Sequence, residues 1–154
     1  MAKKKRKQPG PGSSRRGSVS PQPQWQGIEA LGMLATHIDG MLEADREQYE
    51  TLLEAQPKPH VLDDYTVNRV IKAFTTQRGD FWMFEEQLQR WQTGEVTEDQ
   101  STEVTRLVEQ MRLLRENNQK VLDLAAELSK GTIEKVMAKD DAQLGLEFLL
   151  RGFK

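Results

Sequence analysis

Residues 104–128 read VTRLVEQMRLLRENNQKVLDLAAEL, with apolar side chains at alternating steps of three and four. The positions on this seam are Val104, Leu107, Met111, Leu114, Asn118, Val121, Ala125 and Leu128. Such a heptad, sustained over more than three repeats, is typical of a helix that packs lengthwise against other helices. Thr97, three residues before Gln100, predicts a capping box at the start of this helix, and Gly131 is placed to end it. We therefore expect a helix over about residues 98–130.

Two earlier segments show the same helical spacing. Apolar residues follow one stripe over about residues 28–56, where Pro57 ends the pattern, and over about residues 64–92. The pair Gly79-Asp80 could kink the second helix or split it in two. A shorter C-terminal helix is expected as two pieces, residues 133–138 and 141–151, with Thr132 and Asp140 as candidate N-caps.

These segments predict an all-α protein. The connections near residues 57–63 and 93–98 are short, which favours antiparallel neighbours. We expect an elongated, coiled-coil-like bundle of three antiparallel helices. The C-terminal helix would fold back on this bundle or onto a partner.

The first 24 residues differ sharply in charge from the rest of the chain. They carry seven basic side chains and no acidic one, whereas the remaining 130 residues carry fifteen basic and twenty-four acidic side chains. The chain is thus a tail of charge +7 joined to a body of charge −9, which the net charge of −2 conceals. A charge block of this kind is typical of a solvated interaction arm.

Residues 1–24 are predicted to be a disordered basic tail, and residues 25–154 a helical body. From residue 8 to residue 24 the tail is almost entirely Pro, Gly, Ser and Gln, which cannot bury enough apolar surface to become ordered. Its basic residues are candidates for binding nucleic acid or an acidic partner: Lys3, Lys4, Lys5, Arg6, Lys7, Arg15 and Arg16. The same cluster could serve only as a solubilising end, or as a nuclear localisation signal in a eukaryotic source. Ser18 is a candidate phosphorylation site, because Arg15 and Arg16 precede it at the spacing that basophilic kinases prefer.

Three polar residues interrupt the apolar stripes: Asp45, Arg78 and Asn118. In antiparallel helices, residues at equal distances from the connection lie opposite each other. This relation places all three polar residues near the midpoint of the bundle. Because an unpaired buried charge is costly, we expect them to contact one another as a structural polar layer that fixes the register of the helices. A ligand-binding pocket and a solvent-facing edge are the alternatives.

Surplus apolar residues predict a contact with another chain. Leu113, Leu124 and Leu128 form a second strip on the third helix that two neighbouring helices are not expected to cover. In the C-terminal helix, Leu146, Phe148, Leu149 and Leu150 point in different directions around the axis. These seven residues are the candidate interface of a homo-oligomer or of a contact with a helical protein partner.

The chain offers little for catalysis. It has no cysteine, only two histidines, and no P-loop, dinucleotide-binding or serine-hydrolase motif. The longest apolar run is residues 81–84, far shorter than the ~20 residues that a membrane span needs. We therefore expect no enzymatic activity, no cofactor, no metal site and no membrane span, and a protein that is intracellular, in the cytoplasm or, in a eukaryote, the nucleus.

Two functional hypotheses remain. The first is a non-enzymatic helical module for protein–protein interaction that self-associates and uses its basic tail as a tether. The alternative is a nucleic-acid-associated protein whose tail supplies weak electrostatic binding.

Overall fold

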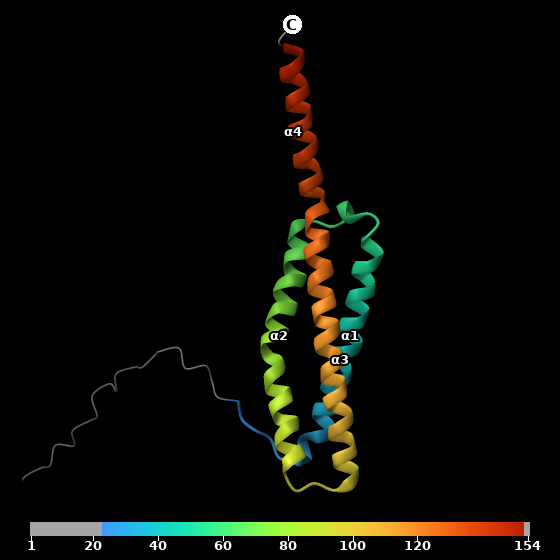
Figure 1. Cartoon of the computed structure of the whole chain (residues 1–154), viewed down its shortest axis with the longest axis vertical. Coiled ribbons are helices and arrows are strands. Elements are labelled where there is room, and N and C mark those ends of the chain that lie inside the picture. Colours follow the sequence, from blue (N-terminus) through green and yellow to red (C-terminus); the bar gives the residue numbers. More distant parts are fainter. Residues whose placement is uncertain (1–22, 153–154) are drawn as a thin grey trace, which may run out of the picture.

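The computed structural model describes residues 23–152, and every regular element in this part of the chain is helical. The all-α prediction is therefore confirmed for the described residues. In chain order the elements are the 3-10 turn η1 (Ile28–Ala30), α1 (Leu31–Ala55), the turn η2 (Pro59–Val61), α2 (Asp64–Thr93), α3 (Glu98–Leu128), the turn η3 (Ser129–Gly131) and α4 (Ile133–Gly152). Helices α1, α2 and α3 lie side by side and alternate in direction, and α4 continues beyond one end of the bundle (Figure 1).

Local capping sets the starts of α2 and α3. The Asp63 side chain accepts a hydrogen bond from the Thr66 amide at 2.7 Å, which satisfies one of the free amides at the start of α2. The predicted capping box at α3 is present, with the Thr97 hydroxyl accepting from the Gln100 amide and the Gln100 side chain accepting from the Thr97 amide. These bonds explain why the predicted starts of both helices agree with the structure.

Helix α2 runs without a break through Gly79. The suggested split at Gly79-Asp80 does not occur, although glycine inside a helix costs about 1 kcal/mol relative to alanine. Phe74, five residues before Gly79, and Phe81, two residues after it, are both buried in the bundle. Their packing offsets that local cost.

The core consists of two apolar clusters along the bundle axis. Near the α2–α3 connection, Ile38 of α1, Phe81 of α2 and Leu107 of α3 are fully buried. Towards the other end, Leu52 of α1 meets Val67 of α2 and Val121 of α3. Helix α3 packs along both α1 and α2, whereas α1 and α2 make few direct contacts with each other. The three helices therefore leave a groove between α1 and α2.

The C-terminal helix departs from the prediction in two ways. Residues 133–152 form the single helix α4, so Asp140 lies inside it and is not an N-cap. There is no proline in this segment, and Gly145 alone does not interrupt a helix of this length. In addition, α4 does not fold back on the bundle but projects away from it as a near-continuation of α3 (Figure 1). None of the helices in the described part of the chain is both long enough and apolar enough to cross a membrane.

Candidate interaction surfaces

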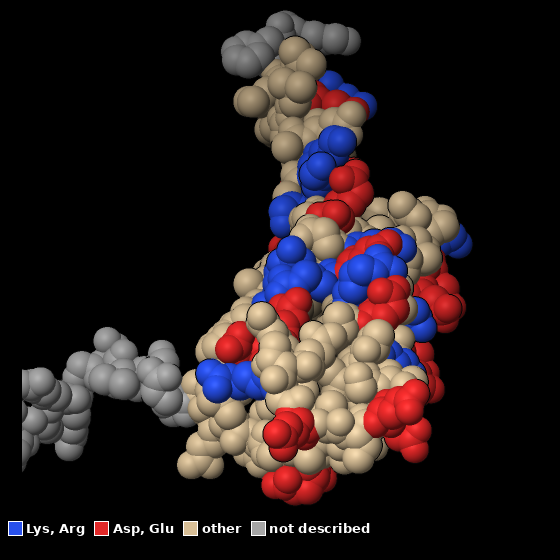
Figure 2. Space-filling model, turned by 60° about the horizontal axis from the view of Figure 1, so that its bottom comes forward, with Lys and Arg blue, Asp and Glu red and all other residues tan. Residues whose placement is uncertain are grey.

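Helix α4 is the most exposed apolar element of the molecule. Its large side chains are between 57% and 78% exposed at five positions: Leu144, Leu146, Phe148, Leu149 and Leu150. Within the described chain, α4 contacts mainly the two turns at its base, η2 and η3. The far end of α4 is accordingly dominated by uncharged side chains, whereas acidic and basic side chains are interspersed over the bundle (Figure 2).

The apolar residues of α4 form two stripes on opposite sides of the helix. At about 100° per residue, Ile133, Met137, Leu144 and Phe148 share one side. Leu146 and Leu149 share the opposite side with two alanines, Ala138 and Ala142. A helix that is apolar on opposite sides is normally covered on both, so α4 has more apolar surface than an isolated chain needs.

The direction of α4 is held by a set of contacts at its base, which we call the α4 joint. The Thr132 hydroxyl is fully buried and donates to the Asp64 carboxylate at 2.6 Å, and Lys135 Nζ donates to the same carboxylate at 3.0 Å. In return, the Asp64 amide donates to Glu134 Oε2 at 2.9 Å. The amide of Ile133 donates to the Leu62 carbonyl, also at 2.9 Å.

Close packing at Gly131 completes the joint. A Cβ atom at this position would lie 2.7 Å from Cγ of Pro59, which is closer than real Cβ atoms come to a neighbour. Glycine is therefore needed here for its small size, since its φ is not positive. The joint ties the start of α4 to the α1–α2 connection, which holds the helix away from the bundle.

The predicted second strip on α3 is wrong for two of its three residues. Leu124 is only 8% exposed and Leu128 only 2%, because both pack in the core cluster with Leu52 and Val67. Leu113 is partly buried against the other cluster. The prediction underestimated how much of α3 is covered, since this central helix is packed on two sides by α1 and α2. The four α4 residues of the candidate interface, by contrast, are all more than half exposed.

The polar residues predicted for the bundle midpoint are connected through a fourth residue, Gln77. Asn118 is fully buried, and its Nδ2 donates to the Phe74 carbonyl at 2.9 Å and to Gln77 Oε1 at 3.0 Å. Gln77 Nε2 in turn donates to Asp45 Oδ1 at 3.3 Å. Arg78 reaches Asn118 Oδ1 at 3.5 Å. Gln77 was not singled out from the sequence, although its spacing of three and four from Phe74 and Phe81 places it on the same stripe.

Asp45 is the least satisfied member of this layer. It is 6% exposed, and its Oδ2 atom is buried without a hydrogen-bond partner among the described residues. Burial raises the pKa of Asp45 to about 6, against the opposing effect of the hydrogen bond from Gln77. The layer thus holds a carboxyl group whose pKa lies well above its usual value.

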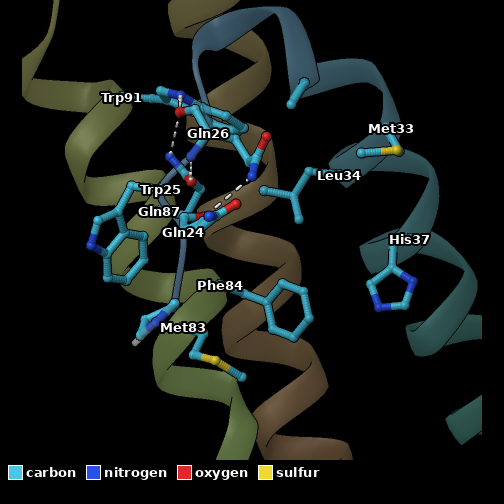
Figure 3. A pocket seen from close by; sticks show the side chains of 12 residues that line it. Gln24, Trp25, Gln26, Met33, Leu34, His37, Met83, Phe84, Gln87 and Trp91 are labelled. Atoms are coloured by element: carbon cyan, nitrogen blue, oxygen red, sulfur yellow. Dashed lines mark hydrogen bonds between the residues drawn. The ribbon is translucent and has the colours of Figure 1, made fainter. Parts of the chain in front are cut away.

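The segment before η1 closes one end of the bundle. The Gln26 amide donates to Gln87 Oε1 at 2.7 Å, and the Gln26 carbonyl accepts from Gln87 Nε2 and from Trp91 Nε1 (Figure 3). The Trp25 ring meets Trp82 edge-on with centroids 6.3 Å apart, and the Arg90 guanidinium lies 4.4 Å above Trp25. We call these contacts of Trp25 and Gln26 with α2 the clamp. Apart from a tryptophan next to a polar segment, no feature of the sequence predicts it.

Beside the clamp, the space between α1 and α2 forms an elongated hollow that we call the α1–α2 groove. Its lining comes from Met33, His37, Met41 and Ala44 of α1, and from Ala73, Asp80, Met83 and Phe84 of α2. The part next to the clamp has a volume of about 440 Å³, and the part further along the helices about 300 Å³. The His37 and Phe84 rings face each other across it at 5.4 Å (Figure 3). Asp80 is the single charged residue among these eight.

The outer face of α3 is different in character. Arg106 pairs with Asp39 at 2.8 Å and with Glu103 at 2.7 Å, and Arg112 pairs with Glu109 and Glu116. Exposed pairs of this kind contribute little stability but mark a surface that faces water. The bundle therefore has a charged face on α3 and a mostly uncharged groove between α1 and α2, with Asp80 as its charged lining residue.

The basic tail contains eight of the residues singled out in the sequence. Lys3, Lys4, Lys5, Arg6, Lys7, Arg15, Arg16 and Ser18 lie outside the described residues. Within residues 23–152, no cluster of three or more His, Asp or Glu side chains is arranged to hold a metal ion.

Comparison of the chain with known protein families, with curated proteins and with solved structures finds no match.

Proposed function

We propose that this protein is a non-enzymatic module for protein–protein interaction, which self-associates through α4. The observation that carries the proposal is a helix of 20 residues with large apolar side chains exposed on two opposite sides. Contiguous apolar surface of this kind is typical of a binding site, whereas single exposed leucines need no explanation.

Burying the exposed apolar side chains of α4 against a partner would be favourable in free energy. Fully burying a leucine or phenylalanine side chain stabilises a protein by about 1.5–3 kcal/mol. Leu144, Phe148 and Leu149 each have more than half of their surface available for such a gain. The α4 joint supports the same role, because a helix that is already oriented loses less freedom when it binds.

A second copy of the chain is the simplest partner, since most oligomers of soluble proteins are symmetric assemblies of identical chains. The turn η1 lies at the end of the bundle opposite α4 (Figure 1).

Light scattering tests self-association. At micromolar concentration the full chain should have a mass near twice 17.7 kDa, and Leu149→Asp should reduce it to that of one chain. Val108→Asp is the matched control, because Val108 is also exposed but lies on α3. A full-length protein that stays monomeric at tens of micromolar would overturn the proposal.

A further inference from the structure

We propose that the α1–α2 groove of one copy receives α4 of a second copy. This inference rests on the proposed self-association and identifies the surface that α4 binds.

The groove has the shape and chemistry of a site for a helix. Helix α3 covers α1 and α2 on one side, and the other side is open between them. Gly40 has no neighbouring atom within 4 Å of a Cβ built on it, and Ala44 and Ala73 are small and exposed. Small side chains on both walls let the backbone of another helix come close. A helix placed here would convert three helices into a four-helix arrangement.

The α4 of the same copy is prevented from filling its own groove. The joint fixes the first residues of α4 through Thr132 and Ile133, and it ties them to Leu62 and Asp64 in the α1–α2 connection. Only η3 and Thr132 separate α3 from α4, so this short link leaves little chain with which to cross that connection. The occupant therefore comes from a different molecule.

The length of the groove matches part of α4. On α2 the groove spans residues 73–84, roughly 18 Å at 1.5 Å per residue, because Gln26 binds to Gln87 and Trp91 beyond this point. This length accepts more than half of α4, whose 20 residues are roughly 30 Å long. The lining is apolar at Met41, Met83 and Phe84, and the methionines can adapt to the leucines of α4.

A two-fold antiparallel pair would cover the groove and one of the two apolar stripes of α4 in each copy. Each copy would contribute one α4 and one groove, and half the surface of a helical segment about 18 Å long and 10 Å wide is roughly 280 Å². The two contacts together bury roughly 560 Å² per copy, or roughly 1,100 Å² in total, which is near the lower limit for a specific protein–protein interface. The ion-paired face of α3 is not part of either contact. The charged side chains on α3 of the two copies therefore do not face each other.

Crosslinking between singly substituted chains tests this arrangement, since the natural chain has no cysteine. One protein carries Ala142→Cys in α4, and its mixing partners carry Ala73→Cys or Ala44→Cys in the groove, or Ala126→Cys on α3 as the control. All four alanines are exposed, so the substitutions are matched. A short bismaleimide is added to each mixture, and light scattering is recorded on the same samples.

We expect the α4 cysteine to crosslink to at least one groove cysteine at least ten times faster than to Ala126→Cys. A dimer that crosslinks equally to the groove and the control would overturn this inference but leave self-association intact. A dimer in which Ala142→Cys crosslinks mainly to itself would show that α4 pairs with α4, which also overturns it. A monomer would overturn both proposals.

Discussion

Asn118 links two helices at the centre of the bundle. Its amide donates to the Phe74 carbonyl and to Gln77, and through Gln77 it is connected to Asp45 of α1. A single side chain therefore fixes α2 against α3 and, indirectly, against α1. Such a layer allows few alternative registers, because a shift by one turn would leave buried polar atoms unpaired.

Asn118→Leu is expected to destabilise the protein. Leucine would fill the space but would leave Gln77 and Asp45 buried without their partner, which costs about 1–3 kcal/mol. Urea unfolding of the variant measures this loss. Unchanged or increased stability, with a change in oligomeric state, would mean that Asn118 acts only on register.

Asp45→Asn is expected to stabilise the protein at high pH. The pKa of Asp45 is raised by burial from 3.8 to about 6, so its contribution to stability is fully present below pH 4 and is lost as pH rises through 6. A shift of this size corresponds to a gain of up to about 3 kcal/mol for the variant at pH 8 and little gain at pH 4. Urea unfolding at both pH values measures the difference.

Asp39→Asn is the control, because its effect on stability at high pH is expected to be opposite to that of Asp45→Asn. The hydrogen bond from Arg106 holds the pKa of Asp39 below its usual value, so its contribution is present above that usual value and is lost as pH falls. This variant should therefore lose stability at pH 8. If Asp45→Asn gave the same gain at pH 4 and pH 8, its effect would not come from the carboxyl charge.

At the level of elements, the α4 joint is the feature on which both proposals depend. It combines a buried hydroxyl, one ion pair and a glycine packed against a proline, all within a few residues. These contacts bring η3 and the start of α4 against the η2 turn and Asp64. The orientation of α4 is thus set by a small number of side chains and not by a large buried area.

Thr132→Val should loosen α4 relative to the bundle. The variant keeps the shape of the side chain but removes the hydrogen bond to Asp64. Spin labels on cysteines at 126 and 142 report the distance between α3 and α4, and its distribution should broaden in the variant. Thr102→Val is the control, because its hydroxyl bonds only within α3. An equally narrow distribution in both variants would show that the hydroxyl does not orient α4.

At the level of the whole molecule, α4 is not part of the core of the bundle. Both core clusters consist of residues from Leu31 to Leu128, and α4 contributes no side chain to either. The stability of the bundle and the ability to associate should therefore be separable.

Ending the chain after Thr132 should leave a folded bundle. We expect the thermal midpoint measured at low protein concentration to change by only a few degrees, since no residue of the core is lost. The same truncation should abolish self-association in light scattering. Loss of the cooperative transition would show instead that the bundle needs α4 to fold.

The elements with local signals could be predicted from the sequence. Helices α2 and α3 begin where Asp63 and Thr97 provide N-caps, and the seam from Val104 to Leu128 is the buried face of α3. Capping acts over three residues and helical periodicity over a few turns, so both can be recognised without knowing any distant contact.

Which neighbour covers each apolar surface depends on the packing of segments that are distant in the chain. Leu124 and Leu128 are covered because α3 lies between two helices, whereas α4 stays exposed because its joint holds it away from them. The contacts responsible join residues far apart in the chain: Thr132 and Asp64 are 68 positions apart, and Gln26 and Gln87 are 61 apart. Periodicity shows which side of a helix is apolar, but only the packing of distant segments determines what lies against it.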